Sequence, residues 1–202
     1  MARSAHETRM KILASAYRLI RRHGFARVKM SDIAAGASLT KRTLYHHFDS
    51  KDALLAAMLD AQHDLAVAAF VKMIDRPKHG PEQVVEGIFA DLASWSATKH
   101  WEGSGFTRLA IELADLPGHP ARRMARQHKA TLERLLAERL ESDGISDAAV
   151  VAREILLLTE GAMVLILIHG DRSYASAAAA AAQGLFRIRR QAAVMADSPT
   201  PT

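Results

Sequence analysis

The chain has 202 residues, 49% of them apolar and 24% charged, and its 27 Lys and Arg against 22 Asp and Glu give a formal charge of +5. This length fits one large or two small domains, and the composition is that of a globular protein with a buried core. The chain contains no cysteine, which excludes disulfides, thiolate metal sites, iron–sulfur clusters and cysteine nucleophiles. A reducing, cytoplasmic location is therefore expected.

We find neither a secretory signal nor a membrane span. Glu7, Arg9 and Lys11 interrupt the N-terminal segment, which also lacks a small-residue cleavage site. The most apolar stretch, residues 155–168, contains Glu160 and falls short of the ~20 apolar residues that cross a bilayer. We expect this stretch to be a buried helix, and we expect no membrane partner.

The charge is distributed unevenly along the chain. Residues 1–51 hold 11 Lys and Arg against 3 Asp and Glu, a balance of +8, whereas residues 52–202 hold 16 against 19, a balance of −3. A basic head on a mildly acidic body is typical of a nucleic-acid-binding module joined to a second domain. Charge alone leaves two alternatives open, a membrane-surface patch and a merely solvated basic face.

Helical periodicity extends along nearly the whole chain, and we find no strand alternation. We therefore predict an all-α protein with about nine helices. In chain order, the helices are expected at about 6–23, 32–37, 41–47, 51–75, 82–98, 106–116, 120–142, 147–169 and 174–193. Gly24 is expected to end the first helix as a C-cap. Residues 196–202 are expected to form a disordered tail.

Residues 31–50 are expected to form two short helices joined by a tight turn at Ser38-Leu39. Ser31, Thr40 and Ser50 are each expected to cap the helix that follows, because a hydroxyl can accept an unpaired N–H of the first turn. Helices this short are unstable alone and must pack on each other. Two short helices joined by a turn of about four residues predict a helix-turn-helix, whose second helix enters the DNA major groove.

Several residues of this region also recur in a known family. They are Gly24-Phe25, Asp32-Ile33-Ala34-Ala35, Thr40-Lys41, Thr43-Leu44-Tyr45-His46-His47-Phe48, Ser50-Lys51 and Ala53-Leu54-Leu55. With them, residues 9–60 resemble the tetracycline-repressor (TetR) family of bacterial transcriptional regulators, with no gap needed. Two positions depart from the family pattern. Ser38 stands where glycine is usual in the turn, and Arg42 where a small residue or proline is common.

Nine residues are candidates for DNA contact: Lys29, Ser31, Thr40, Lys41, Arg42, Thr43, Tyr45, His46 and Lys51. Lys41 and Arg42, at the start of the second helix, are candidates to read guanine O6 and N7. Thr43 is a candidate for a thymine methyl or a phosphate. Phosphate contacts that fix register are expected from Lys29, Ser31, Tyr45, His46 and Lys51, and the resemblance implies this role for Tyr45 and Lys51. A solvated surface position is the alternative for each.

The pair His46-His47 suggests a metal site at first sight. Adjacent helical side chains point about 100° apart, so these two rings cannot both bind one ion without further ligands. We expect no metal here, and we expect His47 to pack inward.

We divide the chain into a helix-turn-helix DNA-binding domain at residues 1–52 and a C-terminal regulatory and dimerisation domain at residues 53–195. The helix-turn-helix covers about 31–50, and the helix at 51–75 connects the two domains. This architecture gives the first domain three helices and leaves the second a helical ligand-binding and dimerisation domain.

The last two helices, at about 147–169 and 174–193, are candidates for a homodimer interface. The first is apolar over more of its circumference than a helix with one solvent face requires, and the alanines at 177–182 allow close approach of a neighbouring helix. A four-helix bundle with a second copy follows, with internal packing as the alternative. The resemblance implies the same, because TetR-family proteins dimerise through their last two helices.

The resemblance also implies a small-molecule pocket in the C-terminal domain, where a ligand alters the separation of the heads and releases DNA. Candidate lining residues are aromatic, polar-tipped or adaptable: Trp95, Trp101, Phe106, His128 and Met163. Plain core packing is the alternative for each of them. We expect no cofactor other than such an effector.

We therefore predict a cytoplasmic, sequence-specific transcriptional regulator that binds a palindromic operator in double-stranded DNA as a dimer. Repression and release by a small molecule are what the resemblance implies. The alternative is a ligand-independent, nucleoid-associated or division-linked DNA-binding protein. Catalysis is not expected, since the chain has no Glu-x-x-His pair, zincin motif or phosphate-binding glycine loop. Glu112, Asp115, Glu133 and Glu138 are expected on solvated helices.

Overall fold

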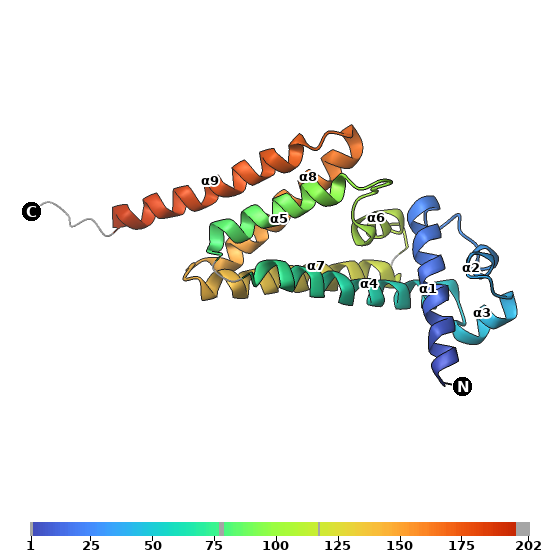
Figure 1. Ribbon diagram of the computed structural model, residues 1–202. Helices are drawn as coiled ribbons and strands as arrows, with labels where there is room; N and C mark the ends of the chain where they lie inside the picture. Colours follow the sequence, from blue (N-terminus) through green and yellow to red (C-terminus); the bar gives the residue numbers. More distant parts are fainter. Residues whose placement is uncertain (1, 77–78, 117, 197–202) are drawn as a thin grey trace, which may run out of the picture. The chain divides into compact units, whose positions relative to one another are not determined.

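The computed structural model describes residues 2–76, 79–116 and 118–196, and these residues form nine α-helices and no strand (Figure 1). The helices are α1 (Ala2–His23), α2 (Met30–Gly36), α3 (Lys41–His47), α4 (Lys51–Ile74), α5 (Pro81–Ser96), α6 (Gly105–Glu112), α7 (Pro120–Ser142), α8 (Ala148–His169) and α9 (Ser173–Ala196). The all-α prediction is confirmed. Of the expected tail, Ala196 ends α9, and residues 197–202 lie outside the described residues.

The helices form two compact units. The head unit consists of residues 1–67 and 104–130, and the body unit of residues 68–103 and 131–202. The head unit holds 16 Lys and Arg against 8 Asp and Glu, a balance of +8, and the body unit holds 11 against 14, a balance of −3. Residues 104–130 thus belong to the basic unit. The functional division proposed between residues 52 and 53 stays a prediction.

In the head unit, α1 crosses α2 in close contact. The hydroxyl of Ser15, which is fully buried, donates a hydrogen bond to the Ile33 carbonyl at 2.9 Å. At Gly36 a Cβ would lie 2.5 Å from the Ser15 Oγ, so only glycine allows this approach. The surrounding core contains Ile12, Leu13, Ala16, Ile20, Phe25, Val28, Met30, Ile33, Ala34, Leu44, Phe48, Leu54 and Leu55.

Three predicted helix-end signals are confirmed in the head unit. The hydroxyl of Thr40 accepts the Thr43 N–H at 3.1 Å, and that of Ser50 accepts the Ala53 N–H at 3.0 Å. Gly24 follows α1 with φ of +81°, the left-handed conformation of a helix C-cap. These signals act over three or four residues, which is why the sequence alone reveals them.

The predicted cap at Ser31 is wrong. Helix α2 begins at Met30, so Ser31 lies inside the first turn and Lys29 occupies the N-cap position. The carboxylate of Asp32 reaches back and accepts the Lys29 N–H at 2.9 Å. A carboxylate is a stronger acceptor than a hydroxyl and is favoured at the positive end of the helix dipole. It therefore fixes the start of the helix earlier than Ser31 would.

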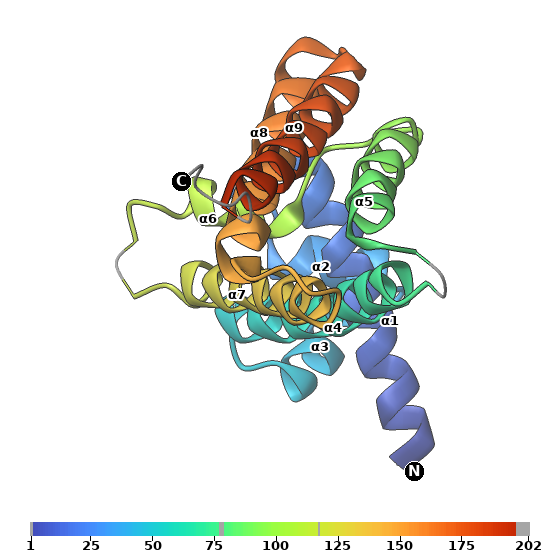
Figure 2. The same ribbon diagram turned by 90° about the vertical axis from the view of Figure 1, so that its left-hand side faces the viewer.

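In the body unit, α9 runs beside α8, and α5 packs along the pair (Figures 1 and 2). Arg189 of α9 donates to the carboxylates of Asp147 at 2.6 Å and Glu154 at 2.8 Å, and these bonds raise its pKa. The shared core contains Val84, Val85, Ile88, Phe89, Leu92, Val151, Ala152, Ile155, Ala162, Met163, Ile166, Ala175, Ala178, Ala182 and Phe186. Helices α8 and α9 therefore form one packed pair.

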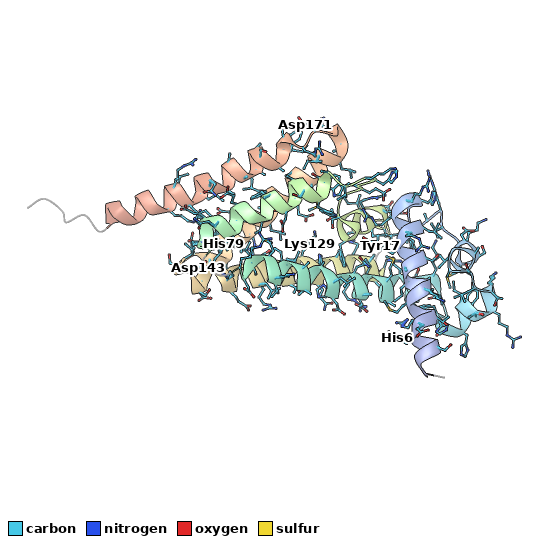
Figure 3. The ribbon with its side chains drawn as sticks, in the orientation of Figure 1. His6, Tyr17, His79, Lys129, Asp143 and Asp171 are labelled. Carbon is cyan, nitrogen blue, oxygen red and sulfur yellow. The ribbon has the colours of Figure 1, made fainter. Side chains whose placement is uncertain are left out.

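The end of α4 is fastened by Arg139 of α7. Its guanidinium donates to the carbonyls of Ile74 at 3.0 Å and His79 at 2.7 Å, and it also pairs with Asp143. His79 and Asp143, two of the partners of Arg139, are labelled in Figure 3. Arg139 thus satisfies carbonyls that the end of a helix leaves without a partner.

Among the described helices, α4 is the one long and apolar enough by length and composition to cross a membrane. Its buried residues Leu54, Leu55, Met58 and Leu59 belong to the core of the head unit. Packing inside the head unit therefore accounts for the apolar side chains in the first part of α4.

Candidate nucleic-acid interface

Helix α3 is anchored from one side and open on the other. Leu44 is fully buried in the core of the head unit, whereas Tyr45 is 42% exposed. Lys41, Arg42 and His46 are also exposed. Arg42 and His46, together with Thr43, line a shallow hollow on the surface. The predicted second helix of the helix-turn-helix therefore presents its polar side chains outward from a fixed base.

The other candidates for DNA contact lie at the starts of the neighbouring helices. Lys29 and Ser31 are exposed at the beginning of α2. Thr40 is exposed too, but its hydroxyl caps α3 and lies 2.8 Å from the hydroxyl of Thr43. Within the head unit, the structure thus brings Thr40, Lys41, Arg42, Thr43, Tyr45 and His46 together on and before α3.

Lys51 is in a different environment from the other candidates. It is half-buried at the start of α4, and its ammonium lies 4.1 Å from the centroid of the Phe25 ring. This distance gives a cation–π contact. Burial lowers the pKa of Lys51, while the nearby carboxylates of Asp52 and Glu112 act in the opposite direction. Its ammonium is therefore already held in place beside the helix-turn-helix.

One arrangement beside the candidate interface was missed in the sequence. Glu112 of α6, expected on a solvated helix, accepts the backbone N–H groups of Phe25 at 3.0 Å and Ala26 at 2.8 Å. Arg108, one turn earlier, donates to the Arg21 carbonyl at 3.1 Å. The partners are more than 80 residues apart, and no local pattern of either segment indicates such a pairing.

A second missed residue is Arg9 of α1. Its guanidinium lies 4.6 Å from the ring centroid of Phe48, which follows the last residue of α3. Only the helical periodicity of α1 was visible in the sequence, and it does not show which later residue Arg9 faces.

The five candidates for a ligand pocket fall into the two units. In the head unit, the rings of Phe106 and His128 are stacked with centroids 3.9 Å apart. In the body unit, the rings of Trp95 and Trp101 meet edge to face at 5.6 Å, and Met163 is buried in the core. The structure thus brings two pairs together, Phe106 with His128 and Trp95 with Trp101.

The rings of His46 and His47 diverge, with an angle of 76° between their planes and centroids 5.7 Å apart. His47 is the more buried of the two. Across residues 2–76, 79–116 and 118–196, no group of three or more His, Asp or Glu side chains is arranged to hold a metal ion.

Comparison with known proteins identifies the helix-turn-helix. The family model of the bacterial regulatory proteins of the tetR family matches residues 12–58, which span α1 to the start of α4. The HTH-type transcriptional regulator TtgR of Pseudomonas putida is 40% identical over 60 residues, 30% of this chain and 29% of that protein. UidR of Escherichia coli K12, also an HTH-type transcriptional regulator, is 34% identical over 88 residues, 44% of each chain.

Residues 12–58 therefore form a helix-turn-helix domain of the TetR type. The chain spans less than half the length of these curated relatives. A TetR-family transcriptional regulator from Streptomyces coelicolor covers more, since 90% of this chain and 95% of that one superpose with a TM-score of 0.80 at 25% identity. The reduced form of NemR from E. coli shares the fold, with a TM-score of 0.82 at 20% identity over 89% of this chain and 96% of that one.

The departure of Ser38 from the TetR pattern has a clear structural setting. Its φ is +57°, in the left-handed region that glycine enters without steric cost and other residues rarely enter. The glycine that is usual in TetR-type turns fits this conformation. Ser38 takes the same path through the turn at some cost in free energy.

Proposed function

We propose that this protein is a transcriptional regulator that binds a palindromic operator in double-stranded DNA as a homodimer. The observation that carries the proposal is the TetR-type helix-turn-helix, with Leu44 anchoring α3 and the polar face of α3 open. The head unit that holds it has a balance of +8, which favours binding to a polyanion. A regulator of this kind acts in the cytoplasm.

In this proposal, the side chains of α3 read bases and those around it bind phosphates. Arg42 and Lys41 donate to guanine O6 and N7, which discriminates against a wrong base by ~1–3 kcal/mol. Thr43 contacts a thymine methyl or a phosphate. Phosphate contacts come from Lys29, Ser31, Tyr45, His46 and Lys51, and they fix the register on the duplex.

The homodimer would form through α8 and α9. Three apolar residues of α8, Val150, Leu157 and Val164, are exposed and recur every seven residues, so they lie on one side of the helix. Ile168 extends this stripe, and Ile188 of α9 is exposed as well. A second copy would cover these side chains in a four-helix bundle. Twofold symmetry then matches two heads to two half-sites ~34–36 Å apart.

Repression and release by a small-molecule effector complete the proposal. The family resemblance supports them, together with the aromatic pairs Phe106 with His128 and Trp95 with Trp101, which place flat apolar rings beside polar atoms. Such an effector must bind one spacing of the heads better than the other, since equal affinity would shift nothing.

Capture of genomic DNA tests the proposal against a ligand-independent, nucleoid-associated role. Purified protein is mixed with sheared DNA of the organism that encodes it at 150 mM salt, and the bound fragments are sequenced. The proposal predicts a few fragments that share a palindrome and are strongly enriched. Even coverage of the genome, or enrichment that follows only AT content, would instead support the nucleoid-associated role.

A further inference from the structure

Glu112 holds the loop between α1 and α2 from a distant part of the chain. Its Oε2 accepts the Phe25 N–H at 3.0 Å, and its Oε1 accepts the Ala26 N–H at 2.8 Å. At Gly24 a Cβ would lie 3.0 Å from Oε1, which is closer than an ordinary van der Waals contact, so a residue without a side chain favours this approach of the backbone to the carboxylate. The backbone of three consecutive residues, 24–26, therefore surrounds the Glu112 carboxylate, and we call this contact the seat.

Arg108 satisfies a second backbone group at the end of α1. If α1 continued beyond Gly24, the Phe25 N–H would donate to the Arg21 carbonyl. Instead Phe25 donates to Glu112, and the Arg21 carbonyl accepts from Arg108 at 3.1 Å. Arg108 and Glu112 are four residues apart on one face of α6. Together they replace the hydrogen bond that the end of α1 leaves unmade.

The loop that Glu112 binds also contacts Lys51, which we propose as a phosphate contact. The Lys51 ammonium lies 4.1 Å from the centroid of the Phe25 ring, and Glu112 is one of the charges that act on it. The His119 ring packs against Phe25 in an edge contact, with centroids 5.6 Å apart. Phe25 is therefore fixed by its backbone at Glu112 and by its ring between Lys51 and His119.

We propose that Glu112 is a positioning residue for DNA binding: by seating Phe25 and Ala26, it holds the Lys51 ammonium where it meets a phosphate. The inference rests on the proposed function, because it needs the head to bind DNA. Hydrogen bonds to a carboxylate are stronger than neutral ones. Without this carboxylate the loop loses two acceptors, and Lys51 loses the fixed ring beneath it.

Charge and position predict opposite effects at this site. Removing a carboxylate near bound DNA removes repulsion from the phosphates and, by itself, tightens binding. Removing the seat weakens binding. Asp115 is exposed three residues further along and has no place in the seat, so Asp115→Ala removes the same charge and serves as the matched control.

The test measures duplex affinity over a series of salt concentrations for the full chain, Glu112→Ala and Asp115→Ala. Glu112→Ala should weaken binding roughly tenfold for each head that contacts the DNA, which is the loss of one charge-assisted contact per head. Its plot of log affinity against log salt should flatten by about 0.9 for each of the two heads, the slope of one phosphate contact. Asp115→Ala should bind with unchanged or slightly higher affinity and an unchanged slope.

Adding Lys51→Ala gives a double-mutant cycle, which separates a positioning effect of Glu112 on Lys51 from a general loss of stability. In the Lys51→Ala background, Glu112→Ala should cost clearly less than in the full chain, because the contact it supports is already gone. Unchanged duplex affinity for Glu112→Ala overturns the inference. A loss of affinity with an unchanged salt slope also overturns it, because that result indicates only a destabilised head unit. If Glu112→Ala does not fold, Glu112→Gln, which keeps one acceptor, replaces it with a smaller expected loss. Failure of the unaltered protein to bind any duplex would count against the proposed function instead.

Discussion

The Nδ1 atoms of His63 and His128 lie 3.0 Å apart. One ring must donate and the other accept, so at most one of these two nitrogens carries a hydrogen while they are in contact. His128 is 4% exposed and stacks on Phe106. Burial lowers the pKa of His128 to about 4, with smaller effects from the charges of Lys129 and His63. The head unit thus keeps a neutral imidazole in its interior.

We expect the protein to lose stability in acid because of His128. The unfolded chain binds a proton at this residue near the ordinary pKa of 6.5, and the folded chain only near 4. Below pH 6.5 the unfolded state therefore holds more protons, and the free energy of unfolding falls by about 3 kcal/mol down to pH 4. Urea unfolding over this range measures the loss. His128→Gln should remove this part of the pH dependence, and an unchanged dependence in the variant would refute the assignment.

Ser38→Gly should stabilise the head unit by about 0.5–1 kcal/mol, because the φ of +57° at Ser38 costs glycine nothing. Thermal unfolding monitored by circular dichroism gives the change. Ala35→Gly is the control, since Ala35 is exposed in α2 of the same unit and glycine inside a helix costs about 1 kcal/mol. Destabilisation by both substitutions would mean that the turn is not strained.

Leu157→Asp should convert the proposed homodimer into a monomer. Leu157 is 68% exposed in the middle of the apolar stripe of α8, and a charge there would be buried unpaired between two copies. Light scattering at micromolar concentration should give twice the chain mass for the unaltered protein and a single mass for the variant. Leu65→Asp is the control, because Leu65 is 66% exposed on α4, which is not part of the proposed α8–α9 interface. A monomeric unaltered protein contradicts the proposed interface.

The sequence predicts best where the physical cause is local. Thr40 and Ser50 cap helices that begin at the next residue, and the order and approximate bounds of the helices follow from apolar periodicity. The error at Ser31 has a local cause too, because the Asp32 carboxylate one residue on competes for the same helix start. Choosing between two adjacent capping groups depends on small differences in free energy that a pattern does not show.

The arrangement around Glu112 could not be predicted in this way. A glutamate on a short amphipathic helix has the pattern of a solvated residue, and its exposure by area agrees with that pattern. Its partners are the N–H groups of Phe25 and Ala26, which every sequence offers. The pairing of His63 with His128 is hidden for the same reason, since only the fold brings α4 and α7 together at these positions.

Binding to duplex DNA should depend steeply on salt, because phosphate contacts lead it. With five to eight phosphate contacts from the two heads together, affinity should fall by roughly three to four orders of magnitude between 50 and 200 mM salt. Tyr45→Phe removes a hydroxyl assigned to a phosphate, so it should weaken all sequences alike. Fluorescence anisotropy with a specific and a random duplex measures both effects. A flat salt response, or a loss at Tyr45 confined to one sequence, would contradict this assignment.

The most direct test of sequence-specific binding is selection of bound sequences from a random duplex library by the purified protein, with Arg42→Ala in parallel. The account predicts a palindrome with two half-sites, and a relaxed preference at one base pair of each half-site when Arg42 is removed. Recovery of featureless or merely AT-rich DNA by the unaltered protein, or an identical palindrome from Arg42→Ala, would contradict it.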